Sequence, residues 1–211
     1  MSAGFVTAAD LQLQLGGIPL ERIRLVPPPG MATDDDAMEV KDREGRTCEV
    51  IDGVLVEKAM GVFESRLAIV LAYFIERYLD SHDLGIALGA DGLVRISATR
   101  SRAPDVSFVK WSKLPNRKFP AAPVPNLVPD LAVEVLSRDN TRAEMDAKLD
   151  DYFTAGVRAV WIIDPKRESA EVYESRHSSL TIGMDGTLVA DGLLPGFQLS
   201  MRELFDRAGN R

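Results

Sequence analysis

The strongest constraint on the fold is a strand, helix, strand pattern between Leu131 and Ile163. The run VPDLAVEVLS is apolar at both alternating positions, which is typical of a strand covered on both faces, and VRAVWIID is a second apolar run. Between them, Thr141 and Glu144 have the spacing of a helix capping box, and Gly156 stands where a helix would end. The pattern predicts two parallel strands joined by a right-handed helical crossover, and therefore an α/β fold.

The first of these strands carries a glutamate, Glu134, in its middle. A buried, ionised carboxylate is costly unless it is paired, hydrogen-bonded or bound to a metal, so Glu134 needs a partner. Lys148 is a candidate, because it follows Met145 by three residues and precedes Tyr152 by four, at the edge of the helix's apolar stripe. The alternative is that Lys148 extends past the apolar face and reaches water.

The rest of the chain supplies further elements. Helices are predicted to start at Thr7 and Thr33, and CEVIDGVLVEK predicts a hairpin that turns at Asp52-Gly53. Val62–Asp80 has apolar residues at helical spacing, with Ile69 and Ile75 broadening the stripe, which predicts a largely buried helix. We expect one domain, residues 1–211, with an N-terminal helical extension (1–46), a core (47–165) and a C-terminal peripheral extension (166–211).

Composition narrows the class of protein. Cys48 is the only cysteine and there are two histidines, so neither an internal disulfide nor a zinc site of finger type is expected. The longest apolar run, Leu67–Ile75, is too short to cross a membrane, and the N-terminus has no basic segment followed by an apolar core. We therefore expect an unexported, cytoplasmic protein without a membrane partner.

Charge is distributed unevenly along the chain. The formal net charge is -7, which argues against general attraction to a polyanion. From Val94 to Lys118, however, seven basic residues accompany one acid, Asp105. This segment is either a solvated basic loop or a surface that faces phosphate groups. In the second case, the candidate nucleic-acid-binding residues are Arg95, Arg100, Arg102, Lys110 and Lys113.

Asp105 is the second isolated acid, between Pro104 and the strand-like run VSFV. Alone, it would be read as a turn residue at the entrance of a strand. Two carboxylates on adjacent strands with a lysine nearby have a different meaning. Carboxylate oxygens hold divalent cations, and the lysine can orient or deprotonate a water, so Asp105, Glu134 and Lys148 together have the equipment to hydrolyse a phosphodiester.

Several segments together resemble a known family. RAPDVSF, PDLAVEVLS, EMDAKLDDYFTAGV and VWIIDP resemble the Uma2 family of endonucleases, formerly a domain of unknown function, in the PD-(D/E)xK restriction-endonuclease-like superfamily. CEVIDGVLVEK and LLPGF are similar to the same family, so the resemblance covers most of the chain from Cys48 onwards. It implies a restriction-endonuclease-like α/β core with a mixed central sheet flanked by helices, a catalytic function for residues 47–165, and DNA as the substrate. It also implies Asp105 and Glu134 as ligands of Mg²⁺ or Mn²⁺, and Lys148 as the catalytic lysine.

The chain departs from the superfamily pattern in two places. The usual lysine stands two residues after the strand glutamate, where this chain has Leu136, so the resemblance depends on a lysine relocated to the following helix. Near the start of the long helix, GVFESRL carries Glu64 where many family members have a histidine. Glu64 is either an extra metal ligand or an acid favoured by the helix dipole. Glu49 is either a further metal ligand or an exposed residue at a strand end.

Two functions of different classes remain open. The first is a metal-dependent endonuclease acting on DNA, for which we expect a homodimer because two active sites suit the cutting of two strands. The second is a non-catalytic nucleic-acid-binding or assembly protein that keeps the nuclease fold. The complete set of two acids and a lysine favours the first. Motifs of other enzyme classes, GxxxxGK[ST], GxSxG and HExxH, do not occur in the chain.

Overall fold

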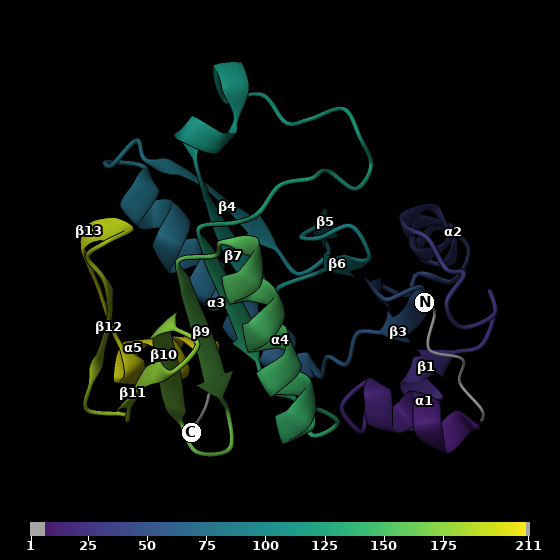
Figure 1. The fold of residues 1–211 in the computed structure, drawn as a ribbon. Helices are drawn as coiled ribbons and strands as arrows, with labels where there is room; N and C mark the ends of the chain where they lie inside the picture. The colour runs from purple at the N-terminus through teal and green to yellow at the C-terminus, as the bar shows by residue number, and fades with distance from the viewer. Residues whose placement is uncertain (1–6, 210–211) are drawn as a thin grey trace.

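The computed structural model describes residues 7–209, so residues 1–6 and 210–211 of the two predicted extensions lie outside the described part (Figure 1). The α-helices are α1 (Ala8–Gln14), α2 (Asp34–Glu44), α3 (Val62–Leu79), α4 (Arg142–Ala155) and α5 (Met201–Ala208). Short 3-10 helices are η1 (Leu20–Arg22), η2 (Trp111–Lys113) and η3 (Pro115–Arg117). The strands are β1 (Ile23–Arg24), β2 (Cys48–Ile51), β3 (Val54–Glu57), β4 (Gly85–Gly89), β5 (Val94–Arg95), β6 (Arg100–Arg102), β7 (Val106–Lys110), β8 (Leu131–Val135), β9 (Ala159–Asp164), β10 (Ser169–Ser175), β11 (Ser178–Ile182), β12 (Thr187–Ala190) and β13 (Leu194–Ser200).

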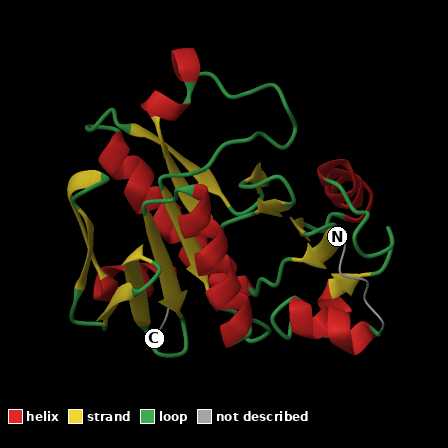
Figure 2. Ribbon diagram, in the orientation of Figure 1, coloured by secondary structure: helices red, strands yellow, loops and turns green. Residues whose placement is uncertain are grey.

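The main sheet has six strands in the order β11-β10-β9-β8-β7-β4. Its central pair, β8 and β9, is parallel and every other pair is antiparallel, so the sheet is mixed. Helix α4 connects the parallel pair, as the sequence predicts, and packs on one face of the sheet. Helices α3 and α5 pack on the other face (Figures 1 and 2). Strand β8 is therefore buried along its whole length, Glu134 included.

A second sheet of five strands, in the order β1-β3-β2-β6-β5, stands beside the main sheet. The predicted hairpin joins β2 to β3, and both turn residues have positive φ, 50° at Asp52 and 76° at Gly53, as a two-residue turn of this kind requires. A Cβ on Gly53 would also lie 2.5 Å from the backbone of Gly30. A glycine is therefore needed at this turn for both conformation and space.

The C-terminal segment corrects one expectation. It is not peripheral, because β10 and β11 continue the main sheet and α5 packs against α3. Phe197, Leu204 and Phe205 are buried in the same core as Trp161 of β9. Strands β12 and β13, which follow the turns at Asp185-Gly186 and Asp191-Gly192, carry inward apolar residues that complete the core.

The helices start where the sequence predicts, but the buried face of α3 is narrower than predicted. Thr7, Thr33 and Thr141 are the N-caps of α1, α2 and α4, each in a complete capping box. On α3, Ile75 is buried as predicted, but Ile69 is 60 % exposed, so the stripe is broadened on one side only, because only one side of the helix meets the sheet. None of the helices within residues 7–209 combines the length and hydropathy that crossing a bilayer requires.

Candidate active site

Asp105 and Glu134 project from neighbouring strands. Val106 of β7 pairs with Val133 of β8, and the backbone N–H of Asp105 donates to the carbonyl of Val133 at 2.9 Å. Continuing this register by one residue places Asp105 opposite Glu134, so both side chains leave the same face of the sheet, the one that α4 covers. They are only 3 % and 4 % exposed. Both carboxylates therefore face the same side of the sheet, as a shared cation site would require.

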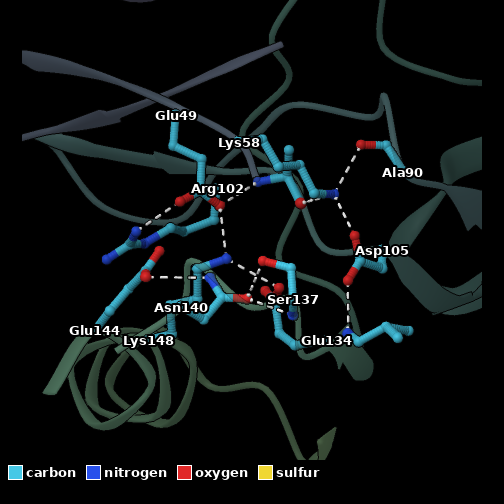
Figure 3. Close-up of polar contacts among 12 residues, drawn as sticks. Glu49, Lys58, Ala90, Arg102, Asp105, Glu134, Ser137, Asn140, Glu144 and Lys148 are labelled. Carbon is cyan, nitrogen blue, oxygen red and sulfur yellow. Dashed lines mark hydrogen bonds and ion pairs between the residues drawn. The ribbon is translucent and has the colours of Figure 1, made fainter. Parts of the chain in front are cut away.

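Lys148 lies against Glu134, as its helical spacing predicts. Its Nζ is 2.9 Å from Oε2 of Glu134 and 3.3 Å from Oε1 of Glu49 (Figure 3). Tyr152, one turn further along α4, donates its hydroxyl to Oε1 of Glu134. Lys148 is 3 % exposed, so its ammonium group does not reach water. The burial of Glu134 is thus compensated by one ion pair and one hydrogen bond from the same helix.

Glu49 of β2 links this group to the second sheet. Its Oε2 accepts from Nη1 of Arg102 at 2.8 Å, and its Oε1 accepts from the backbone N–H of Ala103 at 3.1 Å. Arg102 also pairs with Asp151 of α4, the residue before Tyr152. Glu49 is therefore a buried residue rather than an exposed strand end. Because donors occupy both of its oxygens, it holds Lys148 and Arg102 in place.

Lys58, directly after β3, is a member of the site that the sequence did not reveal. Its Nζ lies 2.8 Å from Oδ1 of Asp105 and donates to the carbonyl oxygens of Ala90 at 3.0 Å and Ala103 at 2.6 Å (Figure 3). The other oxygen of Asp105 accepts from the backbone N–H of Val135 at 2.6 Å. A lysine at the end of a strand is ordinarily a surface residue, so the sequence carries no signal for this contact.

The protonation of the group follows from burial and from its neighbours. Burial would lower the pKa of Lys148, but the facing carboxylates of Glu134 and Glu49 outweigh it and raise that pKa. Burial raises the pKa of Glu134 against the attraction of Lys148. For Glu49, Lys148 and Arg102 overcome the effect of burial and lower the pKa to about 2. Lys148 is therefore an ammonium group at neutral pH, suited to orient or stabilise charge rather than to remove a proton.

Oδ1 of Asp105 is the carboxylate oxygen here that best fits a divalent cation, whereas Glu134, whose two oxygens accept from Lys148 and Tyr152, would ligate through a remaining lone pair. Oδ1 of Asp105 is buried and accepts no hydrogen bond from any described residue, although a cation, the ammonium of Lys58, lies beside it. Within residues 7–209, no three histidine, cysteine or acidic side chains gather in a cluster that would hold a metal on their own. Mg²⁺ commonly binds through one or two carboxylates, with waters and substrate phosphates completing its shell, so this pair suffices.

The other predicted metal ligand, Glu64, is not part of this group. It lies half-buried in the first turn of α3, and its Oε2 occupies the space where a Cβ on Gly61 would be. In the part of the chain that the structure describes, no hydrogen bond or ion pair joins it to Asp105 or Glu134. Its position at the start of a helix agrees with the dipole interpretation.

The basic segment is neutralised by acids from elsewhere in the chain. Arg102 is 1 % exposed, and its guanidinium pairs with Glu49 and Asp151. The prediction that Arg102 contacts phosphate is therefore wrong for this conformation, because a buried and paired group does not reach DNA. Three more of the five predicted residues are paired: Arg95 with Asp34, Arg100 with Asp52 and Asp151, and Lys113 with Asp130. Lys110 is half-buried at the end of β7, at the far end of the strand from Asp105.

The comparisons with known proteins bear on the family and the fold of the chain. The pattern of the family Uma2, described as "Putative restriction endonuclease", matches residues 33–202. The fold is similar to the crystal structure of a "putative nuclease belonging to DUF820" from Anabaena variabilis ATCC 29413, with a TM-score of 0.68. The two chains are 21 % identical, and the match covers 77 % of this chain and 91 % of that one, which confirms the predicted restriction-endonuclease-like fold. No curated protein matches the chain.

Proposed function

The chain belongs to the Uma2 family, and we propose that it is a nuclease that hydrolyses phosphodiester bonds of DNA with the help of Mg²⁺ or Mn²⁺. The observation that carries the proposal is the buried group of Asp105, Glu134 and Lys148. Replacing a buried ion pair by apolar residues is often neutral or stabilising, so stability alone does not favour such a group. A phosphodiesterase, in contrast, needs two hard oxygen ligands and a fixed positive charge at one place.

The proposal gives each residue a role. Asp105 and Glu134 would hold the cation, which would activate a water and stabilise the charge that develops on the phosphate. Lys148 would place its ammonium group toward the same phosphate, where a positive charge stabilises the transition state more than the ground state. Glu49 and Tyr152 contact Lys148 and Glu134 and would keep them in position. Lys110, Lys113, Arg95 and Arg100, none of which is fully buried, remain proposed contacts to the DNA backbone.

The rival function is a binding or assembly protein that has lost the chemistry. In a protein that has lost the activity, evolution would no longer select for ionic side chains at this site, and apolar replacements would be tolerated. The complete set, assembled from β2, β7, β8 and α4, favours catalysis instead. The predicted homodimer and cytoplasmic location are proposals as well, to be tested by light scattering and by cell fractionation.

The test is cleavage of plasmid and linear DNA by the purified protein with Mn²⁺, Mg²⁺ or a chelator. We expect cleavage only with a divalent cation, and we expect Glu134→Gln to lower the rate by about a hundredfold or more, roughly 2.7 kcal/mol in the barrier. Glu64→Gln is the matched control, an equal change outside the group, and should leave the rate within about threefold. Cleavage that survives in Glu134→Gln, or that proceeds in the chelator, would contradict the proposal.

A further inference from the structure

Lys58 gives the site a second ammonium group, on the opposite side of the carboxylate pair from Lys148 (Figure 3). We propose that Lys58 is a displaceable cation of the site: it neutralises Asp105 until a divalent cation takes Oδ1, and it thereby limits how tightly that cation binds. The inference rests on the proposed function, because it assumes that Asp105 is a metal ligand. Lys58 is in this view a positioning residue and acts through Asp105.

The contacts of Lys58 show which of its partners it can release. The carbonyls of Ala90 and Ala103 accept hydrogen bonds from Nζ, at 3.0 and 2.6 Å. Oδ1 of Asp105 is as close, at 2.8 Å, but it is a buried acceptor without a hydrogen bond. The backbone therefore anchors the ammonium, while its interaction with Asp105 is mainly Coulombic. Such an interaction can be exchanged for that of another cation without breaking a hydrogen bond.

A cavity gives the ammonium group somewhere to move. It has a volume of about 250 Å³, and its lining includes both Lys58 and Ala90, whose carbonyl Nζ already contacts. Glu57 and Asp91 also line it; Glu57 already pairs with Arg24 and Arg46, so Asp91 is the acidic partner that a displaced ammonium would find there. Lys148 has no comparable freedom, because α4 and two carboxylates enclose it. Of the two lysines, Lys58 is therefore the one that can yield its place.

The charge of the group supports the same exchange. In the connected group of ion pairs around Asp105 and Glu134, four carboxylates face three basic groups among the side chains less than a tenth exposed: Glu49, Asp105, Glu134 and Asp151 against Lys58, Arg102 and Lys148. A divalent cation added to this set meets the nearby positive charge of Lys58, and two cations that share one oxygen repel each other strongly at low dielectric. Movement of Lys58 away from Asp105 relieves that repulsion.

The experiment measures Mn²⁺ binding by calorimetry without DNA, so its readout does not depend on cleavage. Lys58→Met keeps the length of the side chain and removes the charge, and we expect it to bind Mn²⁺ about tenfold more tightly than the parent while melting at a lower temperature without metal. Lys41→Met is the matched control. Lys41 donates to the carbonyl of Asp91 at 2.9 Å, beside the same cavity, so its loss should change Mn²⁺ affinity less than twofold. If Lys58→Met does not fold, Lys58→Gln, which keeps a donor for the carbonyls, takes its place.

The outcomes distinguish a failure of the role proposed for Lys58 from a failure of the proposed nuclease function. Unchanged or weaker Mn²⁺ binding by the charge-removing variants, with binding by the parent intact, overturns the role of Lys58 and leaves the nuclease proposal standing. A tighter affinity that appears equally in Lys41→Met overturns it too, because the effect would then be general electrostatics. Absence of Mn²⁺ binding in the parent overturns both proposals. Tighter binding in Lys58→Met alone supports the exchange.

Discussion

Lys148 and Lys58 place ammonium groups against the two carboxylates of one acidic pair, but in different surroundings. Lys148 stands on a helix between Glu134 and Glu49, and those carboxylates are held in turn by Tyr152 and Arg102. Lys58 follows a strand, is held by two backbone carbonyls, and borders a cavity. The same chemical pair is thus fixed in one half of the site and free to rearrange in the other. This difference suggests how a site can be both well ordered and open to a cation.

The largest expected effect is on stability in the fixed half. Arg102→Met leaves the carboxylates of Glu49 and Asp151 buried without their main partner, and breaking such a pair costs about 3 to 5 kcal/mol. Arg100→Met is the control, because Arg100 shares Asp151 but its side chain is 30 % exposed, so we expect a loss below about 1 kcal/mol. Urea unfolding measures both.

The same measurement on Lys58→Met sharpens the comparison. We expect its loss of stability to be smaller than that of Arg102→Met, because water can enter from the cavity and solvate Asp105. Equal losses for the two variants would mean that the surroundings of Lys58 are as rigid as those of Lys148, which would contradict the difference proposed between the two halves of the site.

The second effect is a dependence of stability on pH. Lys148 and Arg102 overcome burial and lower the pKa of Glu49 from near 4.5 to about 2, so its ionisation stabilises the folded state at neutral pH. This contribution, about 3 kcal/mol, is present above pH 4.5 and is lost as the pH falls toward 2. Glu134 has the opposite sign, because burial raises its pKa and its ionisation costs stability.

Comparing Glu49→Gln with the parent isolates the contribution of Glu49. The free energy of unfolding of the parent should fall more steeply between pH 4.5 and 2 than that of the variant, which has no proton to bind at this position. Equal slopes for the two proteins would show that Glu49 is not held by Lys148 and Arg102 in solution.

Local patterns in the sequence were enough to predict the contact between Glu134 and Lys148 in the fixed half of the site. Glu134 stands out because it interrupts a strand that is apolar on both faces, and Lys148 is placed by helical spacing toward that strand. Both signals extend over a few residues, and the crossover between β8 and β9 brings them together. Tyr152 follows Lys148 by one helical turn, so its contact with Glu134 was within reach of the same reasoning.

The open half depends on contacts between distant segments. Lys58 meets Asp105 only because the end of β3 approaches the segment before β7, and no periodicity in the chain encodes that approach. The basic segment failed for a related reason. A sum of charges along the chain cannot show that Glu49, Asp52 and Asp151 fold against its arginines. For the same reason, the sequence did not reveal that the C-terminal strands contribute to the core, because the residues they pack against lie in α3 and β9.

The central claim is that Lys148 acts in the chemistry of a cation-dependent nuclease, and single-turnover cleavage by Lys148→Met tests it most directly. Methionine keeps much of the apolar stem and deletes the charge, so we predict a rate lowered by about a hundredfold or more, roughly 2.7 kcal/mol, with DNA affinity little changed. Lys41→Met, measured in parallel, should cleave like the parent. A Lys148→Met protein that is folded and cleaves within about threefold of the parent would contradict the claim.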